Sequence, residues 1–312
     1  MTEREKDVTV SAEVRRAETL QVLKDRIRQL PLLPGAIVDL VRLDSSADNY
    51  FDRVVTLVSG DPGFATKVLQ FANSAASSPP HPILSIREAL LRIGAVRAVN
   101  LIVGHSAARV FIPREGWERD LWYHATDVAE LMRALAPTVR GGRVDPDTAY
   151  LFGLLHDVGR FVLYLDAPAE LRAVDETEWG SAQQLIDAER SVMGFTHAEL
   201  GSLALAKWQL PRDLVVFVRH HHTPVRGLDS VPAHILAFIP LVQLADWVAI
   251  TLSRRVGWRE LTPAELHDLL APALSPAVGL SVADLAAIAR TALDRSAATR
   301  EALGLASVVA KA

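Results

Sequence analysis

The stretch AYLFGLLHDVGRFVLYL, residues 149–165, places His156 and Asp157 side by side in a segment that is otherwise almost wholly apolar. The apolar residues predict a buried helix, in which a polar side chain costs free energy unless it has a partner. A divalent metal ion is one such partner, and an aspartate can bridge two ions. Helix neighbours diverge by about 100°, so both residues serve one site only if Asp157 bridges. The alternative is that the pair caps backbone carbonyls where Gly159 ends the helix.

The composition limits the fold and the chemistry. The 312 residues are 50% hydrophobic and 22% charged, enough to bury one large core or two smaller ones, and they include no cysteine. Any metal must therefore be held by nitrogen and oxygen, and the lack of disulfides favours a cytoplasmic protein. We find no uninterrupted apolar run near the length of about 20 residues that crosses a bilayer, and no signal peptide, so we expect no membrane association. The formal net charge of -4 argues against general binding to nucleic acid, although a local basic patch stays open.

Apolar residues recur at spacings of three and four along most of the chain, which predicts an all-α fold. The segment IPREGW, around Pro113, is the expected hinge between two helical parts. We expect a polar, frayed N-terminus at 1–16, an N-terminal helical bundle at 17–112, a helical core at 117–255 and a C-terminal helical extension at 256–312. Helix starts are predicted at Ser85 with Glu88, at Thr262 with Glu265 and at Ser281 with Asp284.

Histidines and aspartates recur on or beside successive apolar helical segments. Five of the ten histidines have ordinary packing or surface interpretations: His81, His105, His220, His234 and His267. A metal shared by the others would provide partners for all of them at once. The candidate ligands are His124, His156, Asp157, His197, His221, His222 and Asp246.

The order of these segments resembles the HD superfamily, and specifically its HDOD branch of bacterial signalling proteins. The segments are WYHATDVA, GLLHDVGR, HAELG ahead of WQLP, HHTP and LADWVA. Three earlier segments, LPLLPGAIVDLVRL, VSGDPGFATKVLQFANSA and HPILSIREALLRIGAVRAVNLIV, are similar to the opening of HDOD domains, which HD phosphohydrolases in general lack. The resemblance covers roughly residues 28–250 and implies an N-terminal bundle packed on an HD-like helical core.

The related HD-GYP phosphodiesterases of cyclic di-GMP suggest which residues bind metal. By that similarity the seven candidates above match ligands of one or two divalent ions of iron, manganese or zinc. Asp120, one helical turn before His124, stands where that family can carry a further carboxylate. In the triple histidine, either His220 with His221 or His221 with His222 could be the pair of ligands. The following Thr-Pro favours His221 with His222. The glycine-tyrosine-proline loop is replaced by TPVRGLDSVPAH, which argues against cyclic di-GMP hydrolysis.

Two functions are consistent with this resemblance. In the first, which the HDOD resemblance favours, the chain is a signal-transduction output module that binds a signalling protein or a small nucleotide ligand; a homo-oligomer stays open. In the second, it is a metal-dependent phosphohydrolase of a nucleotide or cyclic (di)nucleotide phosphoester, with Asp157 bridging the ions. Arg160, where catalytic relatives often carry lysine, or Lys207 would then stabilise negative charge. Asn73 is expected to cap its helix, with a hydrogen bond to the HD-like half as the alternative.

Overall fold

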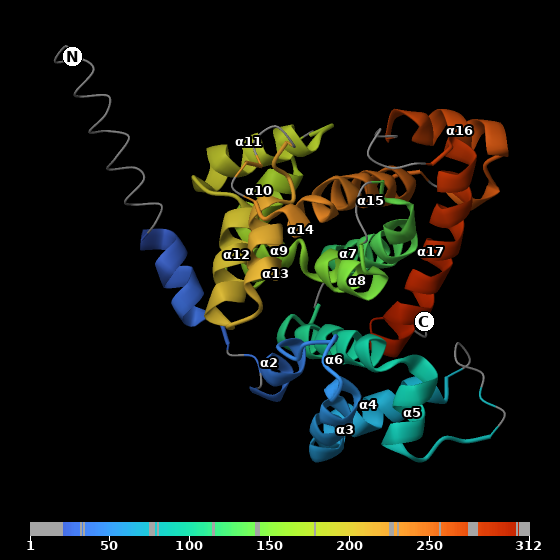
Figure 1. The fold of residues 1–312 in the computed structure, drawn as a ribbon. Coiled ribbons are helices and arrows are strands. Elements are labelled where there is room, and N and C mark those ends of the chain that lie inside the picture. The colour runs from blue at the N-terminus through green and yellow to red at the C-terminus, as the bar shows by residue number, and fades with distance from the viewer. Residues whose placement is uncertain are drawn as a thin grey trace, which may run out of the picture.

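The computed structural model describes residues 21–31, 33, 35–74, 79, 81–113, 116–140, 144–177, 179–224, 228–229, 231–255, 257–273, 280–303 and 305. Every regular element in these ranges is a helix (Figure 1), so the prediction of an all-α fold is confirmed. The polar N-terminus expected at 1–16 lies outside the described residues.

The first helices form a group of their own, drawn in blue and teal in Figure 1. Residues 21–29 are helical, and the N-terminal bundle follows them. Its helices are α2 (Gly35–Val41), α3 (Tyr50–Gly60), α4 (Pro62–Ala72), α5 (Ile86–Ile93) and α6 (Ala95–Val110). Two helix starts follow directly from local sequence: the Asp61 side chain accepts from the first backbone N–H groups of α4, and Ser85 accepts from the N–H of Glu88 in α5.

Asn73 ends α4 and ties the following loop to the N-terminal bundle. Its Nδ2 donates to the carbonyls of Leu69 and Ile83, both at 2.8 Å, and its Oδ1 accepts from the backbone N–H of Ile83. The expected cap is therefore present. The alternative, a hydrogen bond to the HD-like half, is wrong, because both ends of the amide are already engaged by backbone groups of the same bundle.

The next helices form the central bundle, green to orange in Figure 1, with α7 packed against α8 and α15. Its helices are α7 (Gly116–Leu135), α8 (Pro146–Leu155), α9 (Val158–Asp166), α10 (Pro168–Asp175), α11 (Ala182–Met193), α12 (His197–Lys207), α13 (Arg212–His220), α14 (Ala233–Leu236) and α15 (Phe238–Ser253). The 3-10 helix η1 (Ala136–Thr138) follows α7.

One expectation about apolar segments needs correction. Ala233–Ser253 is long and apolar enough to cross a membrane by length and composition, with a mean hydropathy of 2.0. However, 61% of its apolar window is buried inside the protein, and the segment brings the buried Asp246 into the interior. These properties are those of the central core helix of a folded domain.

The C-terminal helices pack against both the N-terminal bundle and the central bundle. They are η3 (Trp258–Glu260), α16 (Pro263–Leu270), η4 (Ala271–Ala273) and α17 (Val282–Leu303). α17 lies along α7 and also contacts α6, as Figure 1 shows in red. Buried polar contacts hold it on α7: Thr299 donates to Glu130 at 2.9 Å, and Ser296 donates to Asp127. The capping boxes predicted at Thr262 and Ser281 begin α16 and α17.

Lys207 connects α12 to the helix at 21–29. Its Nζ donates to the carbonyls of Ile27 at 2.6 Å and of Arg28 and Leu30 at 3.0 Å. These carbonyls lie at the end of that helix, where a cation is favourable. The expectation that Lys207 could stabilise charge on a substrate is therefore wrong, because its ammonium group serves the fold elsewhere.

The crossing of α9 and α12 provides a test of the packing. A Cβ atom on Gly159 would lie 1.9 Å from the carbonyl oxygen of His197 and 2.8 Å from the nitrogen of Gly201. We expect Gly159→Ala to lower the free energy of unfolding by about 3 kcal/mol or more, because two backbones would have to separate. Gly60→Ala is the control, since nothing lies within 4 Å of its Cβ position, and it should change stability by less than about 1 kcal/mol. Urea unfolding followed by circular dichroism measures both; similar effects would contradict the close crossing.

Candidate metal centre

His156 and Asp157 lie at a break between two helices. α8 ends at Leu155 and α9 begins at Val158, so the expectation of one continuous buried helix is wrong. Because the two residues lie between helices, their side chains do not have to diverge by the angle of neighbours in a continuous helix. Both side chains face the cluster of histidines and aspartates. Nδ1 of His156 lies 2.7 Å from the carbonyl oxygen of Gly153 near the end of α8, so the capping interpretation holds for His156, whereas Asp157 makes no capping hydrogen bond to α9. Both residues are buried.

The structure brings all seven candidate ligands together in two groups. In each group, one nitrogen or oxygen atom per residue lies within 4.8 Å of those of the other members. Bonds to a first-row metal are about 2.0 to 2.2 Å long, so these spacings suit ligands around a common ion. The first group is Asp157, His197, His221 and His222, and the second is His124, His156 and Asp246.

Asp157 lies between the two groups. Its Oδ1 is 3.1 Å from Nε2 of His197 and 3.5 Å from Nε2 of both His156 and His221. Its Oδ2 is 3.8 Å from Nε2 of His124. Oδ1 is buried and has no hydrogen-bond partner among the described residues. One carboxylate therefore presents an oxygen to each group, which is the arrangement of a bridging ligand.

The Nε2 atoms are directed into the site by hydrogen bonds on the other side of each ring. Nδ1 of His156 and Nδ1 of His221 each lie 2.7 Å from a backbone carbonyl oxygen three residues earlier. A carbonyl oxygen only accepts, so each Nδ1 carries the proton and each Nε2 presents a lone pair. These Nε2 atoms face Nε2 of His124 at 3.3 Å and of His197 at 3.1 Å. Such pairs of nitrogens need a proton or a cation between them.

Glu189 on α11 holds His197, and the sequence analysis missed it. Its Oε1 lies 2.6 Å from Nδ1 of His197, and its Oε2 accepts from the backbone N–H of His197 at 2.9 Å. Both side chains are fully buried. A carboxylate behind a histidine is the usual orienting partner of a metal ligand. One signal was available: Glu189 lies four residues after Leu185, on the buried face of an amphipathic helix.

Burial and neighbouring charges separate the pKa values of the histidines. Burial lowers the pKa of His156 to about 4. Burial alone would also lower the pKa of His197, but the carboxylates of Glu189 and Asp157 outweigh it and raise that pKa to about 10. Burial would raise the pKa of Asp157, yet His156 and His197 hold it well below its usual range. Without a metal, these charges keep Asp157 anionic and a proton on His197.

Two other predicted residues lie outside both groups. Asp120 is exposed on α7 and lines a hollow beside His124. The ring of His220 lies 3.3 Å from the hydroxyl of Thr223 and is not part of either group. Of the two registers left open for the triple histidine, the structure therefore brings His221 and His222 to the site.

Arg160 lies on the wall of that hollow, which has a volume of about 250 Å³ and also reaches Asp157, His222 and Asp246. Its Nη2 donates to Asp175 at 2.5 Å, and its Nη1 lies 3.8 Å from Glu189. Nη1 is buried and makes no hydrogen bond within the described part of the chain. Arg160 thus places a buried positive charge at the wall of the hollow, where it would attract an anionic group.

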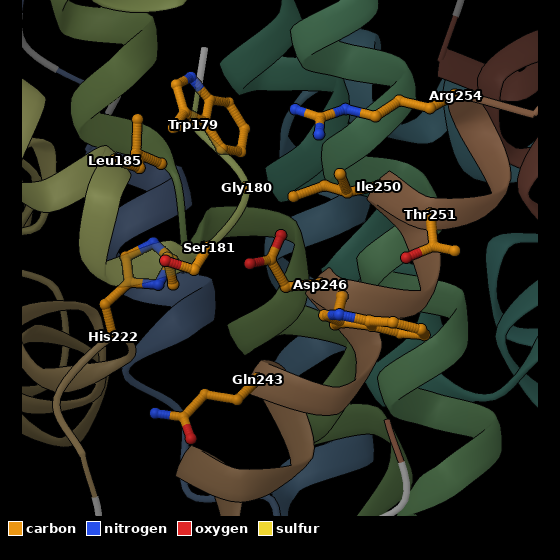
Figure 2. Close-up of a pocket in the computed structure, with 12 residues that line it drawn as sticks. Trp179, Gly180, Ser181, Leu185, His222, Gln243, Asp246, Ile250, Thr251 and Arg254 are labelled. Atoms are coloured by element: carbon orange, nitrogen blue, oxygen red, sulfur yellow. The ribbon is translucent and has the colours of Figure 1, made fainter. Parts of the chain in front are cut away.

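An adjoining pocket extends the hollow along α15. It has a volume of about 330 Å³, and Figure 2 shows His222 and Asp246 on different sides of it, with Trp179 and Arg254 farther out. Two of the candidate ligands, His222 and Asp246, thus line a cavity that is large enough for a small molecule.

Comparisons with known proteins agree with this architecture. Residues 30–224 match the family model of the HDOD domain. An uncharacterized protein of Treponema pallidum (strain Nichols) is 29% identical over 226 residues, which are 72% of this chain and 43% of that relative. This chain therefore spans less than half the length of that relative.

Solved structures at low sequence identity share the fold. An HDOD domain protein of unknown function from Geobacter sulfurreducens has a TM-score of 0.68 at 21% identity, covering 93% of this chain and 99% of that one. A provisionally named phosphohydrolase from Shewanella amazonensis SB2B has a TM-score of 0.63 at 23% identity, over 91% and 95%. A provisionally named signal transduction protein from Marinobacter aquaeolei VT8 has a TM-score of 0.64 at 21% identity, over 93% and 66%. Because the family model matches more than half of its residues, this chain belongs to the HDOD domain family.

Proposed function

We propose that this chain is a signalling protein of the HDOD family whose central bundle binds divalent metal ions and hydrolyses the phosphoester of a nucleotide. The observation that carries the proposal is the position of Asp157 Oδ1, which is buried without a hydrogen-bond partner between the Nε2 atoms of three histidines. A buried anionic oxygen that makes no hydrogen bond is costly; without a metal, the charge on His197 at 3.1 Å offsets part of that cost, and a bound cation would take over this role.

The residues that would hold the ions are the two groups described above, with Asp157 shared between them. Their nitrogen and oxygen atoms suit zinc, iron or manganese. Bound ions would polarise a phosphoryl oxygen and lower the pKa of a water molecule toward about 7.

The chain's own residues would bind and orient the phosphate group. Arg160 is fixed by Asp175 at 2.5 Å and lines the hollow, where its guanidinium charge would attract a phosphate group. Glu189 keeps the ring of His197 in one orientation through Nδ1. The substrate would enter through the hollow that both Arg160 and Asp157 line.

A second candidate is a non-catalytic output module, and the N-terminal bundle favours it. The described residues of α2–α6 supply no member of either ligand group. The bundle is nevertheless joined to the central bundle, for example through Arg42, whose Nε donates to the carbonyl of Gln209 at 3.0 Å. A relay needs a second packed element that can change its docking, and this bundle is such an element. Its output would be the binding of another signalling protein.

Metal binding is the first test. We expect one or two equivalents of manganese or zinc to bind the metal-free protein more tightly at pH 8 than at pH 6, because ligand nitrogens must lose their protons. His197, with a pKa of about 10, carries a proton at both pH values, and the metal must displace this proton to bind. A higher pH lowers the proton concentration and therefore favours metal binding. Glu189→Gln should weaken binding by about 10- to 100-fold, because the orienting carboxylate is lost.

Isothermal titration calorimetry in buffers of different ionisation enthalpy measures both the affinity and the protons released. Asp187→Asn is the matched control, because Asp187 is exposed on the same helix. Binding that neither releases protons nor distinguishes the two variants would contradict the assigned site.

Hydrolysis is the second test. We expect the manganese-loaded protein to hydrolyse at least one substrate among cyclic mononucleotides, cyclic dinucleotides and bis(p-nitrophenyl) phosphate. Asp157→Asn should reduce that turnover by about 100-fold or more, because the amide has nearly the same shape but lacks the negative charge. Asp213→Asn, at an exposed ion pair with His234, is the control and should keep turnover.

The same assay separates the two candidate functions. Turnover that survives Asp157→Asn would contradict the proposed site. A protein that binds metal stoichiometrically but hydrolyses none of these substrates would favour the output module, and partner binding by wild type and Asp157→Asn would then be compared.

A further inference from the structure

The pocket next to the metal centre has walls that differ from those of the metal centre itself. It lies between the start of α11 and the outer half of α15 (Figure 2). Apart from His222 and Asp246 at the metal centre, Arg254 is its only charged lining residue among the described parts of the chain. Most of the remaining wall is apolar or aromatic, with Trp179, Leu185, Trp247 and Ile250 supplying the large side chains.

This pocket is continuous with the hollow that contains Arg160. The two cavities share the lining residues Trp179, Leu185, His222, Asp246 and Ile250. A ligand seated in the pocket could therefore extend directly to the metal ligands. The hollow offers Arg160 and a set of carboxylates that bound cations would have to neutralise before a phosphate could enter, and the pocket offers aromatic side chains to a second group.

The aromatic end is suited to a flat, uncharged ring system. Trp179 and Trp247 are each half-buried at the pocket, so part of each indole remains accessible. The guanidinium carbon of Arg254 lies 4.6 Å from the centroid of a Trp179 ring, so Arg254 covers one face of this indole and a base would stack on the other. Aromatic rings of this kind are platforms on which nucleobases stack.

The polar groups of the pocket are few and fixed. Nε2 of Gln243 donates to the carbonyls of His221 and Thr223, both at 3.0 Å, which leaves its Oε1 as an acceptor of known orientation. Ser181, labelled near Asp246 in Figure 2, adds a hydroxyl. A sugar ring would leave several hydroxyls unpaired against the tryptophans, whereas a base has two apolar faces and needs partners only along its edge.

We propose that this pocket is a nucleobase subsite, in which the base of a nucleotide stacks on Trp179 and Trp247 while its phosphate reaches Arg160 in the adjoining hollow. The inference rests on the proposed function and names the residues that would select nucleotides among phosphoesters. Trp179 and Trp247 would then determine specificity, and the histidines and Arg160 would bind the part that all phosphoesters share.

The test measures binding rather than turnover. Isothermal titration calorimetry with the manganese-loaded full chain would compare adenosine and guanosine 5′-monophosphates with ribose 5-phosphate, which lacks a base. We expect at least one nucleotide to bind about ten-fold or more tightly than ribose 5-phosphate. In Trp179→Leu that preference should fall toward one, whereas Trp179→Phe, which keeps a ring, should retain most of it.

The outcomes distinguish this inference from the proposed function. Equal affinity for nucleotides and ribose 5-phosphate in the wild type, or a preference that Trp179→Leu leaves intact, would overturn the subsite while leaving phosphoester hydrolysis standing. A base preference that depends on Trp179, in a protein without turnover, would support the subsite and overturn hydrolysis. Absence of nucleotide binding would overturn the subsite.

Discussion

The carboxylate of Asp157, buried among imidazole nitrogens, is the constraint on which the rest of the central bundle depends. Removing an anion from water is costly, and the cost is recovered only if compensating groups are held close. Here the compensating imidazoles come from α7, from the break between α8 and α9, from the start of α12 and from the end of α13, whereas α15 adds a second carboxylate, Asp246, which repels that of Asp157. These elements must therefore all be placed correctly at once, and the fold is organised around that requirement.

Backbone features provide much of this placement. Gly159 lets α9 approach α12 so closely that a single added carbon would overlap the carbonyl of His197. Thr196 and Glu199 form a capping box that begins α12 at His197, so the ligand lies at a defined helix end. Glu189 then fixes the orientation of the His197 ring through its Nδ1. The ligands are thus oriented before any metal arrives, which reduces the entropy lost on binding.

The candidate metal centre and the two cavities beside it each offer groups for a different part of the proposed function. The histidines and aspartates provide a place for cations, Arg160 faces the same hollow, and the tryptophan-lined pocket continues from it. The described residues of α2–α6 contribute no candidate ligand, but Arg42 joins this bundle to Gln209 after α12, and Lys207 on α12 binds the preceding helix at 21–29.

The sequence by itself determined the all-α class, the family and the residue types of the metal centre, because apolar periodicity and ordered histidine-containing segments are local properties. It also marked helix starts such as Ser85 and Thr262, where a side chain accepts a hydrogen bond from the backbone of its own helix. Only the tertiary structure decided that His156 and Asp157 lie at a helix break, that Glu189 supports His197 and that Lys207 serves a distant helix. These features depend on contacts between segments far apart in the chain, where the paths of the loops and the crossing of helices set the distances, and a sequence pattern does not encode those distances directly.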